Sequence, residues 1–251
     1  SIILNGVLNT LHLIYYMRKI VILSGAGMSA ESGLKTFRDS DGLWENHNIY
    51  DVATPEAWAR DPELVLNFYN DRRKQVQSTK PNVAHQSLVA LEKKYDVKII
   101  TQNIDDLHER AGSTQVYHLH GEINKARSTG DATLLYKLDH WKIKIGDKCE
   151  KGYQLRPHIV WFGEPVPMIE EAIPIVEIAD FIIVIGTSLS VYPASGLLNY
   201  APTFSEKYYI DPKGLEGINL FDFKIIKEKA SKGVPDLVDS LLIKKLPNQG
   251  A

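Results

Sequence analysis

Cysteine, long apolar runs and unbalanced charge are all scarce in this chain. Its 251 residues include one cysteine, Cys149, which excludes an intrachain disulfide and fits a reducing compartment. No apolar run approaches the roughly 20 residues that a membrane-spanning helix needs. The formal net charge of -2 lacks the basic excess that is typical of nucleic-acid-binding proteins. We therefore expect neither a membrane nor a nucleic acid as partner.

Residues 1–16 are apolar and nearly uncharged, and Met17 follows them. No basic stretch precedes the apolar part and no small-residue cleavage site follows it, so the segment lacks the pattern of a secretory signal. Two interpretations stay open. The segment is either a non-native extension with Met17 as the natural start, or an additional N-terminal helix that packs on the domain.

Short apolar runs alternate with amphipathic stretches along most of the chain. This alternation predicts an α/β fold with a doubly wound, mostly parallel sheet. The expected strands cover residues 19–24, 97–101, 116–119, 158–162, 181–186, 207–211 and 218–222. The expected helices cover residues 61–77, 82–95, 169–179, 193–200 and 235–242. Asp61 and Pro62 are suited to the N-cap and first position of the first helix, and Pro174 should kink the third.

Two regions interrupt this alternation. Residues 36–58 are polar and rich in turn-forming residues, as in a loop that folds over a ligand. Residues 122–157 are rich in lysine and show only weak periodicity. The second region therefore indicates a small inserted module between two strands of the sheet.

Polar side chains follow two of the expected strands. Gln102, Asn103 and Asp105 come after the second strand, and His120 follows the third. Ligands bind past the carboxyl ends of such strands in open α/β sheets, which favours a binding site here. Taken singly, each residue has a structural alternative, because asparagine and aspartate often cap turns and a histidine after an apolar run is often simply packed.

A glycine turn follows the first expected strand. Gly25, Gly27 and Ala30 have the G-x-G-x-x-A spacing, in which glycines permit a tight turn and close approach of a pyrophosphate. This spacing favours nucleotide binding over a purely structural turn. No acidic residue ends a second strand about 20 residues later, so ordinary hydride transfer is disfavoured.

Five motifs taken together closely resemble the sirtuins, the NAD-dependent protein-lysine deacylases. They lie at residues 25–38, 102–105, 118–121, 160–164 and 186–188, in the family's order, within a similarity that spans about residues 19–245. The resemblance implies a Rossmann-like sheet in a single catalytic domain at 17–245, with small-module insertions at about 36–80 and 122–157 and a tail at 246–251. Nothing in the sequence suggests an obligate assembly, so we expect a monomer, and the missing targeting signal together with the resemblance implies the cytoplasm.

The resemblance implies that NAD is consumed as a co-substrate. The acyl oxygen of the substrate lysine would attack the ribose carbon as nicotinamide leaves, with Asn103 at the site and His120 as general base on a ribose hydroxyl. Free lysine, nicotinamide and O-acyl-ADP-ribose would be the products. The residues that the resemblance assigns to NAD are Gly25, Ala26, Gly27, Ala30, Glu31, Thr36, Phe37, Arg38, Gln102, Asn103, Asp105, Gly186, Thr187, Ser188, Asp211 and Gly233.

Asp211 departs from the family, which usually has asparagine beside the adenosine ribose. A carboxylate can accept hydrogen bonds from both ribose hydroxyls, and it would repel a 2′-phosphate. We therefore expect NAD to be preferred to NADP.

The resemblance also implies a substrate site for acylated lysine side chains of proteins. The substrate backbone would pair as a β-strand with Val160, Trp161, Phe162, Gly163 and Glu164.

The acyl pocket of class III sirtuins is matched by Ala53, Tyr69 and Arg72. Tyr69 and Arg72 share one helix face and could hold the carboxylate of a succinyl or malonyl group, although an ordinary exposed face is the alternative. We expect desuccinylation and demalonylation alongside deacetylation. The rival hypotheses are an ADP-ribosyltransferase and a catalytically silent NAD-sensing scaffold.

Most sirtuins hold a structural zinc with two cysteine pairs in the small module. Here Cys149 is the only thiol, and His140 does not complete a four-ligand site. We therefore expect metal-free folding, and stoichiometric zinc in an elemental analysis would contradict it. The apolar side chains expected to pack in place of the metal are Leu134, Leu135, Tyr136, Leu138, Trp141 and Ile143.

Overall fold

A six-stranded parallel sheet forms the larger part of the computed structural model, which describes residues 17–34, 43–44, 47–214 and 221–244. The strands run in the order β11-β10-β9-β1-β4-β5, and every neighbouring pair is parallel. Their bounds are β1 Lys19–Ser24, β4 Asp96–Thr101, β5 Val116–His118, β9 Phe181–Ile185, β10 Glu206–Ile210 and β11 Phe223–Ile226. The predicted doubly wound α/β sheet is confirmed.

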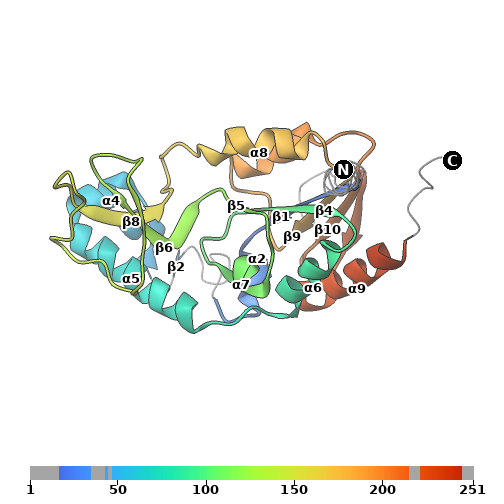
Figure 1. Ribbon diagram of the computed structural model, residues 1–251, viewed down its shortest axis with the longest axis horizontal. Helices are drawn as coiled ribbons and strands as arrows, with labels where there is room; N and C mark the ends of the chain where they lie inside the picture. The colour runs from blue at the N-terminus through green and yellow to red at the C-terminus, as the bar shows by residue number, and fades with distance from the viewer. Residues whose placement is uncertain (1–16, 35–42, 45–46, 215–220, 245–251) are drawn as a thin grey trace, which may run out of the picture.

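Helices cover both faces of this sheet (Figure 1). Successive side chains of a strand point to opposite faces, so Ile20 and Ile22 pack with α6 and α9, while Val21 and Leu23 pack with α8 and the 3-10 helix η1. The bounds are α6 Val83–Leu91, α8 Met168–Val176, η1 Ala194–Tyr200 and α9 Ala230–Ile243. Within the described ranges, every helix is too short or too polar to cross a membrane.

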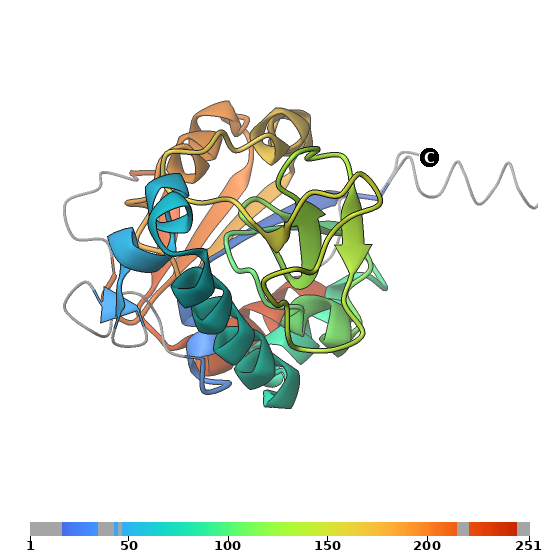
Figure 2. The same ribbon diagram turned by 90° about the vertical axis from the view of Figure 1, so that its left-hand side faces the viewer.

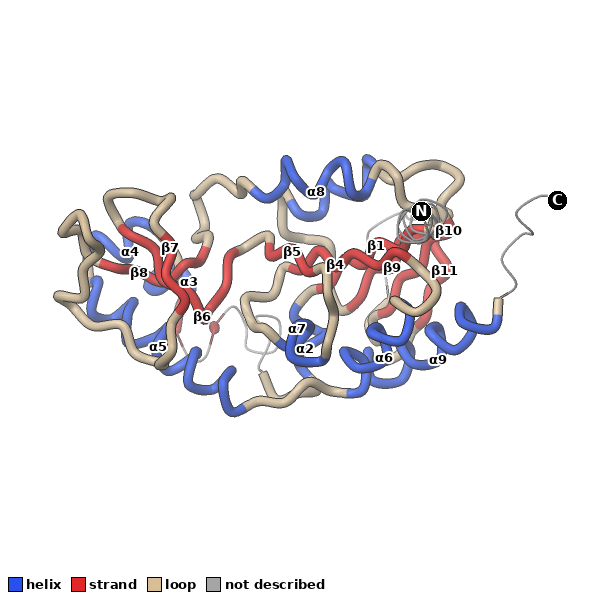
Figure 3. Tube along the Cα trace, viewed as in Figure 1, coloured by secondary structure: helices blue, strands red, loops and turns tan. Residues whose placement is uncertain are grey.

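A smaller antiparallel sheet lies beside the larger one, together with α5 (Figures 2 and 3). Its strands are β6 Gly121–Ser128, β7 Leu135–Lys137 and β8 Leu155–Ile159, in the order β7-β6-β8. The helices that share a buried cluster with it are α3 Ile49–Val52, α4 Pro55–Arg60 and α5 Pro62–Ser78. Phe68 of α5, Ile123 of β6 and Ile159 of β8 share one buried cluster, so the two chain segments fold as one packed unit.

Short elements complete the described fold. They are α2 Ala26–Ala30, α7 Leu107–Ala111, β2 Leu43–Trp44 and β3 His47–Asn48. Helix α5 begins as its sequence predicted, because the Asp61 carboxylate accepts a hydrogen bond from the Leu64 N–H at 2.9 Å and Pro62 holds the first position.

Two predicted strands are placed differently. The run at 158–162 does not belong to the parallel sheet, since β8 ends at Ile159 and pairs antiparallel with β6. Apolarity alone does not distinguish these two settings of a short strand. The last strand is Phe223–Ile226 rather than 218–222, of which residues 218–220 lie outside the described residues.

Two other expectations are wrong in part. The described portion of 36–58 contains the short helices α3 and α4, because Asn48 and Thr54 cap them by accepting backbone hydrogen bonds at 3.0 Å. Helix α9 begins at Ala230 rather than Pro235. Burial of Ala230 and Val234 in the core extends this helix ahead of the proline.

The small module has an apolar cluster of its own. Ile143 is buried, and Tyr136 and Leu138 pack against that cluster, as expected for these residues. Leu135 is 46% exposed, so its predicted role in the core is wrong. Successive side chains of a strand point to opposite faces. Tyr136 of β7 packs inward, so its neighbour Leu135 points outward.

A buried arginine joins α5 to this module. Arg73 is fully buried, and its guanidinium donates to the carbonyls of Ile123 at 2.5 Å and Trp141 at 2.7 Å. Asn70, one turn earlier, exchanges two hydrogen bonds of 2.8 Å with the backbone of Ile143. Burial lowers the pKa of Arg73 to about 10, which still leaves it charged at neutral pH.

Replacing Arg73 should destabilise the fold strongly. Arg73→Met keeps the length of the side chain but leaves buried carbonyls without donors, so we expect a loss of about 2–4 kcal/mol in the free energy of unfolding. Urea denaturation followed by circular dichroism measures the change. Gln77→Met, at an exposed position of the same helix, is the matched control. Equal stability of the two variants would contradict the role of Arg73 in joining α5 to the small module.

Candidate functional site

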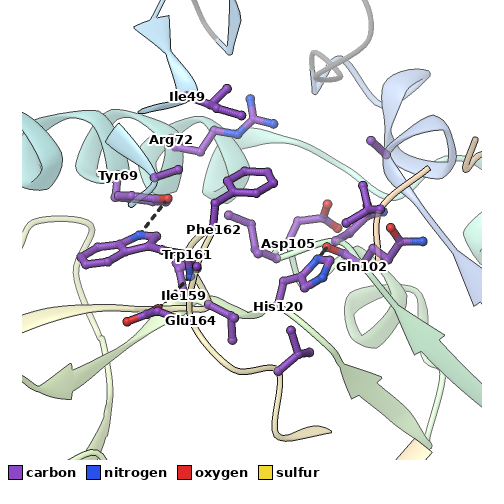
Figure 4. Close-up of a pocket in the computed structure, with 18 of the residues that line it drawn as sticks. Ile49, Tyr69, Arg72, Gln102, Asp105, His120, Ile159, Trp161, Phe162 and Glu164 are labelled. Carbon is purple, nitrogen blue, oxygen red and sulfur yellow. Dashed lines mark hydrogen bonds between the residues drawn. The ribbon is translucent and has the colours of Figure 1, made fainter. Parts of the chain in front are cut away.

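A cavity of about 520 Å³ lies between the carboxyl edge of the parallel sheet and the small module. Figure 4 shows Gln102, Asp105 and His120 on one side and Tyr69, Arg72 and Trp161 on the other. The predicted site residues that line the cavity are Ala26, Ala53, Tyr69, Arg72, Gln102, Asn103, Asp105, His120, Val160, Trp161, Phe162, Gly163 and Glu164. The structure therefore brings together residues from six separated segments of the chain.

The turns after β1, β4 and β9 meet at this edge. The Gln102 side-chain amide donates to the Thr187 hydroxyl at 3.1 Å. The Asn103 amide donates to the Gly25 carbonyl at 3.0 Å and to the Ser29 hydroxyl at 3.2 Å. These bonds fix both amides relative to the glycine turn, so the polar edge is preorganised.

Glycine is required where the first turn touches the turn after β9. A Cβ on Gly27 would lie 2.7 Å from the Gly186 Cα, and one on Gly25 would lie 2.6 Å from the Thr187 Cβ. The Gly27 N–H donates to the Gly186 carbonyl at 2.8 Å. The spacing of the glycine motif thus reflects close contact between two turns, in addition to any approach by a ligand.

His120 has a defined tautomer. Its Nδ1 lies 3.1 Å from the Gln102 carbonyl oxygen. A carbonyl can only accept, so Nδ1 carries the hydrogen and Nε2 keeps its lone pair. Burial lowers the pKa of His120 below 6.5, and the bond to Gln102 opposes this shift. The imidazole is therefore neutral at neutral pH and able to accept a proton.

His118 is in the opposite electrostatic situation. Its Nδ1 lies 2.9 Å from the Asn103 carbonyl oxygen, and its Nε2 lies 2.7 Å from the Glu109 carboxylate. Burial lowers the pKa of His118, but the hydrogen bond and charge of Glu109 outweigh burial and raise it above 6.5. His118 does not line the cavity and instead supports the Asn103 backbone.

The side of the cavity that belongs to the small module carries Tyr69 and Arg72. The Tyr69 hydroxyl accepts a hydrogen bond from the Trp161 indole at 3.1 Å, and Arg72 donates to Gln75 at 2.9 Å. Burial raises the pKa of Tyr69, so the phenol stays neutral. A guanidinium and a phenol on one wall can bind an anionic group, and the small side chain of Ala53 lines the same wall.

Asp105 is buried at the other side of the cavity. Burial raises its pKa, while hydrogen bonds from the Leu107 N–H and from Ser29 oppose the shift. A carboxylate held in this way is suited to accepting hydrogen bonds from ligand hydroxyls.

The remaining predicted residues either lie outside the described residues or do not line the cavity. Thr36, Phe37 and Arg38 lie outside the described residues. Glu31 accepts a hydrogen bond of 2.9 Å from the Ser231 N–H at the start of α9. The other predicted cofactor residues absent from the lining are Gly25, Gly27, Ala30, Gly186, Thr187, Ser188, Asp211 and Gly233.

Gly233 and Asp211 have clear structural surroundings. A Cβ on Gly233 would lie 2.7 Å from the Ile210 Cγ2, so this glycine lets α9 approach the sheet. Asp211 follows β10 at the carboxyl edge, and its carboxylate accepts a hydrogen bond from the Lys213 N–H at 2.9 Å. Its position leaves it at the same edge as Gly25 and Thr187.

The cavity also has lining residues that the sequence did not predict. They are Ser29, Leu34, Ile49, Ile104, Ile159, Val166, Ser190, Val191, Tyr192 and Pro193. Ser29 could have been found from its place inside the glycine motif. The others are mostly apolar, and no spacing in the sequence separates them from ordinary core residues.

The described residues offer no group of three or more histidine, cysteine, aspartate or glutamate side chains that could hold a metal ion. Cys149 is buried, and its thiol donates to the Ser128 hydroxyl at 3.3 Å. These residues do not fit a structural zinc, and zinc-free folding stays a prediction.

Comparisons with known proteins agree on one family. The family model described as Sir2 family matches residues 25–193. An NAD-dependent protein deacylase of Bacteroides thetaiotaomicron is 51% identical over 231 residues, covering 90% of this chain and 99% of that protein. One of Helicobacter pylori is 51% identical over 226 residues, covering 90% of this chain and 98% of that protein.

Solved structures are similar over almost the whole chain. A mutant Sir2 homologue in complex with ADP-ribose has a TM-score of 0.83 at 38% identity, with 95% of this chain and 99% of that chain covered. A Sir2 homologue in complex with NAD has a TM-score of 0.80 at 39% identity, with 93% of each chain covered.

The two histidines should titrate on opposite sides of 6.5, with His120 below it and His118 above it. Nuclear magnetic resonance of the imidazole protons against pH measures both values. In Glu109→Gln the pKa of His118 should fall, because the charge of Glu109 raises it, while His120 should be unchanged. The reverse order of the two values would contradict the hydrogen-bond assignments.

Proposed function

The chain belongs to the Sir2 family, and we propose that it is an NAD-dependent protein-lysine deacylase that removes succinyl, malonyl and acetyl groups. One observation supports this proposal above the others. A single cavity has a neutral histidine, two fixed amides and a buried carboxylate on one side, and an arginine with a phenol on the other. The substrates would be acylated lysine side chains of proteins.

The polar edge fits a dinucleotide co-substrate. The amides of Gln102 and Asn103 are held by hydrogen bonds to the turns after β9 and β1. Asp105 is buried beside them and can accept hydrogen bonds from hydroxyl groups. NAD, when bound, would supply the ribose carbon that receives the acyl oxygen as nicotinamide leaves, and O-acyl-ADP-ribose would be released.

His120 would act as the general base. Its Nδ1–H is engaged by the Gln102 carbonyl, so Nε2 is the atom that would take a proton from a ribose hydroxyl. The same carbonyl would then stabilise the imidazolium, because its partial negative charge lies 3.1 Å from Nδ1. Asn103 would orient the reacting groups through its fixed amide.

Arg72 and Tyr69 would bind the carboxylate of an acidic acyl group. A guanidinium supplies charge-assisted donors in a rigid plane, and a neutral phenol can add a further one. The segment from Val160 to Glu164 would hold the substrate backbone, and the Phe162 N–H already donates to the Ala53 carbonyl at 3.0 Å. An acetyl group would use the same cavity without the ionic contact.

Three further features complete the proposal. Asp211 at the carboxyl edge would favour NAD over NADP by repelling a 2′-phosphate. The protein would act as a monomer in the cytoplasm. Residues 17–245 would form one catalytic domain, with the segments 36–80 and 122–157 supplying its small module.

The test uses acetyl-, malonyl- and succinyl-lysine peptides with and without NAD, with mass spectrometry of the products. We expect lysine release only with NAD, together with nicotinamide and O-acyl-ADP-ribose. His120→Asn should lower kcat by about 100-fold or more, because general-base catalysis contributes about that much. Transfer of ADP-ribose to protein without deacylation would identify a transferase instead. An absence of any NAD turnover would favour a silent NAD-binding scaffold.

Arg72→Ala separates acyl recognition from chemistry. We expect kcat/KM for the succinyl peptide to fall by about 100-fold, since a buried charge-assisted pair contributes about 2–3 kcal/mol. Deacetylation should change by less than about threefold, because an acetyl group has no charge to pair. Arg60→Ala, which removes an exposed arginine paired with Asp51 on the surface, is the control. Equal losses on both peptides would refute the assignment of Arg72.

A further inference from the structure

One wall of the cavity carries Tyr69 and Arg72 and is called the acyl wall below. A second arginine lies behind this wall without lining the cavity. Arg156, on β8, is 7% exposed, and its guanidinium carbon lies 3.2 Å from the centroid of the Trp161 ring. Its Nη1 and Nη2 donate to the two oxygens of Glu164 at 2.7 and 3.1 Å. Nη2 also donates to the Ile159 carbonyl at 2.9 Å. The hydrogen bonds along the edge of the Arg156 guanidinium thus fix its plane, and the face of the guanidinium packs against the Trp161 indole.

Glu164 fixes the same tryptophan from the backbone side. Its carboxylate accepts the Trp161 N–H at 2.8 Å and one donor of Arg127 at 3.0 Å. Two guanidiniums therefore share a single carboxylate, which leaves one surplus positive charge close to the acyl wall. Burying such a group costs stability that an apolar cluster would not, and Arg156 Nε has no hydrogen-bond partner in the described structure. Stability alone does not account for the arrangement.

Trp161 transmits this support to Tyr69. The indole Nε1 donates to the Tyr69 hydroxyl at 3.1 Å, and Figure 4 shows this bond on the wall that also carries Arg72. Both rings are almost fully buried, so neither can rotate without disturbing the core. Because the phenol oxygen accepts the indole hydrogen, the phenol's own hydrogen has to be donated in another direction.

We propose that Arg156 is a positioning residue that sets the preference for acidic acyl groups. It does so by orienting the Tyr69 hydroxyl through Trp161, and it does not itself line the cavity. This inference rests on the proposed function, since it presumes that the cavity accepts an acidic acyl group. Arg72 would make the direct contact, and Arg156 would determine how well Tyr69 shares in it.

Arg156→Lys tests the proposal, because lysine keeps the charge but loses the planar stacking and the paired hydrogen bonds. We expect KM for a succinyl-lysine peptide to rise about tenfold with little change in kcat, a shift typical of one lost charge-assisted contact. Acetyl turnover and the KM for NAD should change by less than about threefold. Arg127→Lys, which leaves the Trp161 ring supported, is the matched control and should retain the parental ratio of succinyl to acetyl turnover.

Trp161→Phe removes the indole donor while keeping an aromatic ring. Combined with Arg156→Lys, it should give no further loss of succinyl preference, because both changes act through the same bond to Tyr69. Additive losses would overturn the proposal, and so would equal effects of Arg156→Lys on succinyl and acetyl peptides. If the parent protein itself does not turn over succinyl-lysine, the proposed function fails together with this inference. If the parent does turn it over and only the Arg156 variants behave otherwise than expected, this inference alone fails.

Discussion

The cavity depends on the attachment of α5 to the small sheet, which a buried guanidinium reinforces beside a shared apolar cluster. Arg73 bridges α5 to β6 and to the loop before Ile143. Tyr69 and Arg72 lie within the preceding turn of the same helix, so their positions follow from this bridge. An apolar side chain at position 73 could fill the space, but it could not satisfy the carbonyls that converge there. Buried hydrogen bonds of Arg73 therefore help to fix the positions of Tyr69 and Arg72.

The two sides of the cavity are electrostatically different. On the sheet side, Gln102 holds His120 in the tautomer that leaves Nε2 as an acceptor, and burial keeps the ring neutral. On the module side, arginines outnumber the carboxylate that pairs with them. A base and an anion-binding wall would interfere with each other if they were adjacent, because a nearby cation lowers the proton affinity of a histidine. Placing them on separate structural units avoids this conflict.

Sequence reasoning was most successful where local signals and topology agree. The strand 19–24, the glycine turn and the residues after β4 and β5 were predicted because buried parallel strands are apolar and end at one edge. It was less successful in the small module. The 158–162 run was assigned to the wrong sheet, and nothing in the helix pattern identified Arg73 as a buried side chain. Long-range partners such as Ile123 and Trp141 determine that burial, and no local period encodes them.

The separation of the two sides has a consequence for how such an enzyme can diversify. The groups proposed to bind the dinucleotide lie at strand ends of one sheet, whereas the groups proposed to select the acyl chain lie on α5, on β8 and directly after β8. The side-chain amides of Gln102 and Asn103 bond to Thr187, Gly25 and Ser29, so substitutions at Tyr69 or Arg72 remove none of these hydrogen bonds. Substitutions in the small module can therefore change which acyl groups are accepted over evolutionary time, without altering the residues proposed to carry out the reaction.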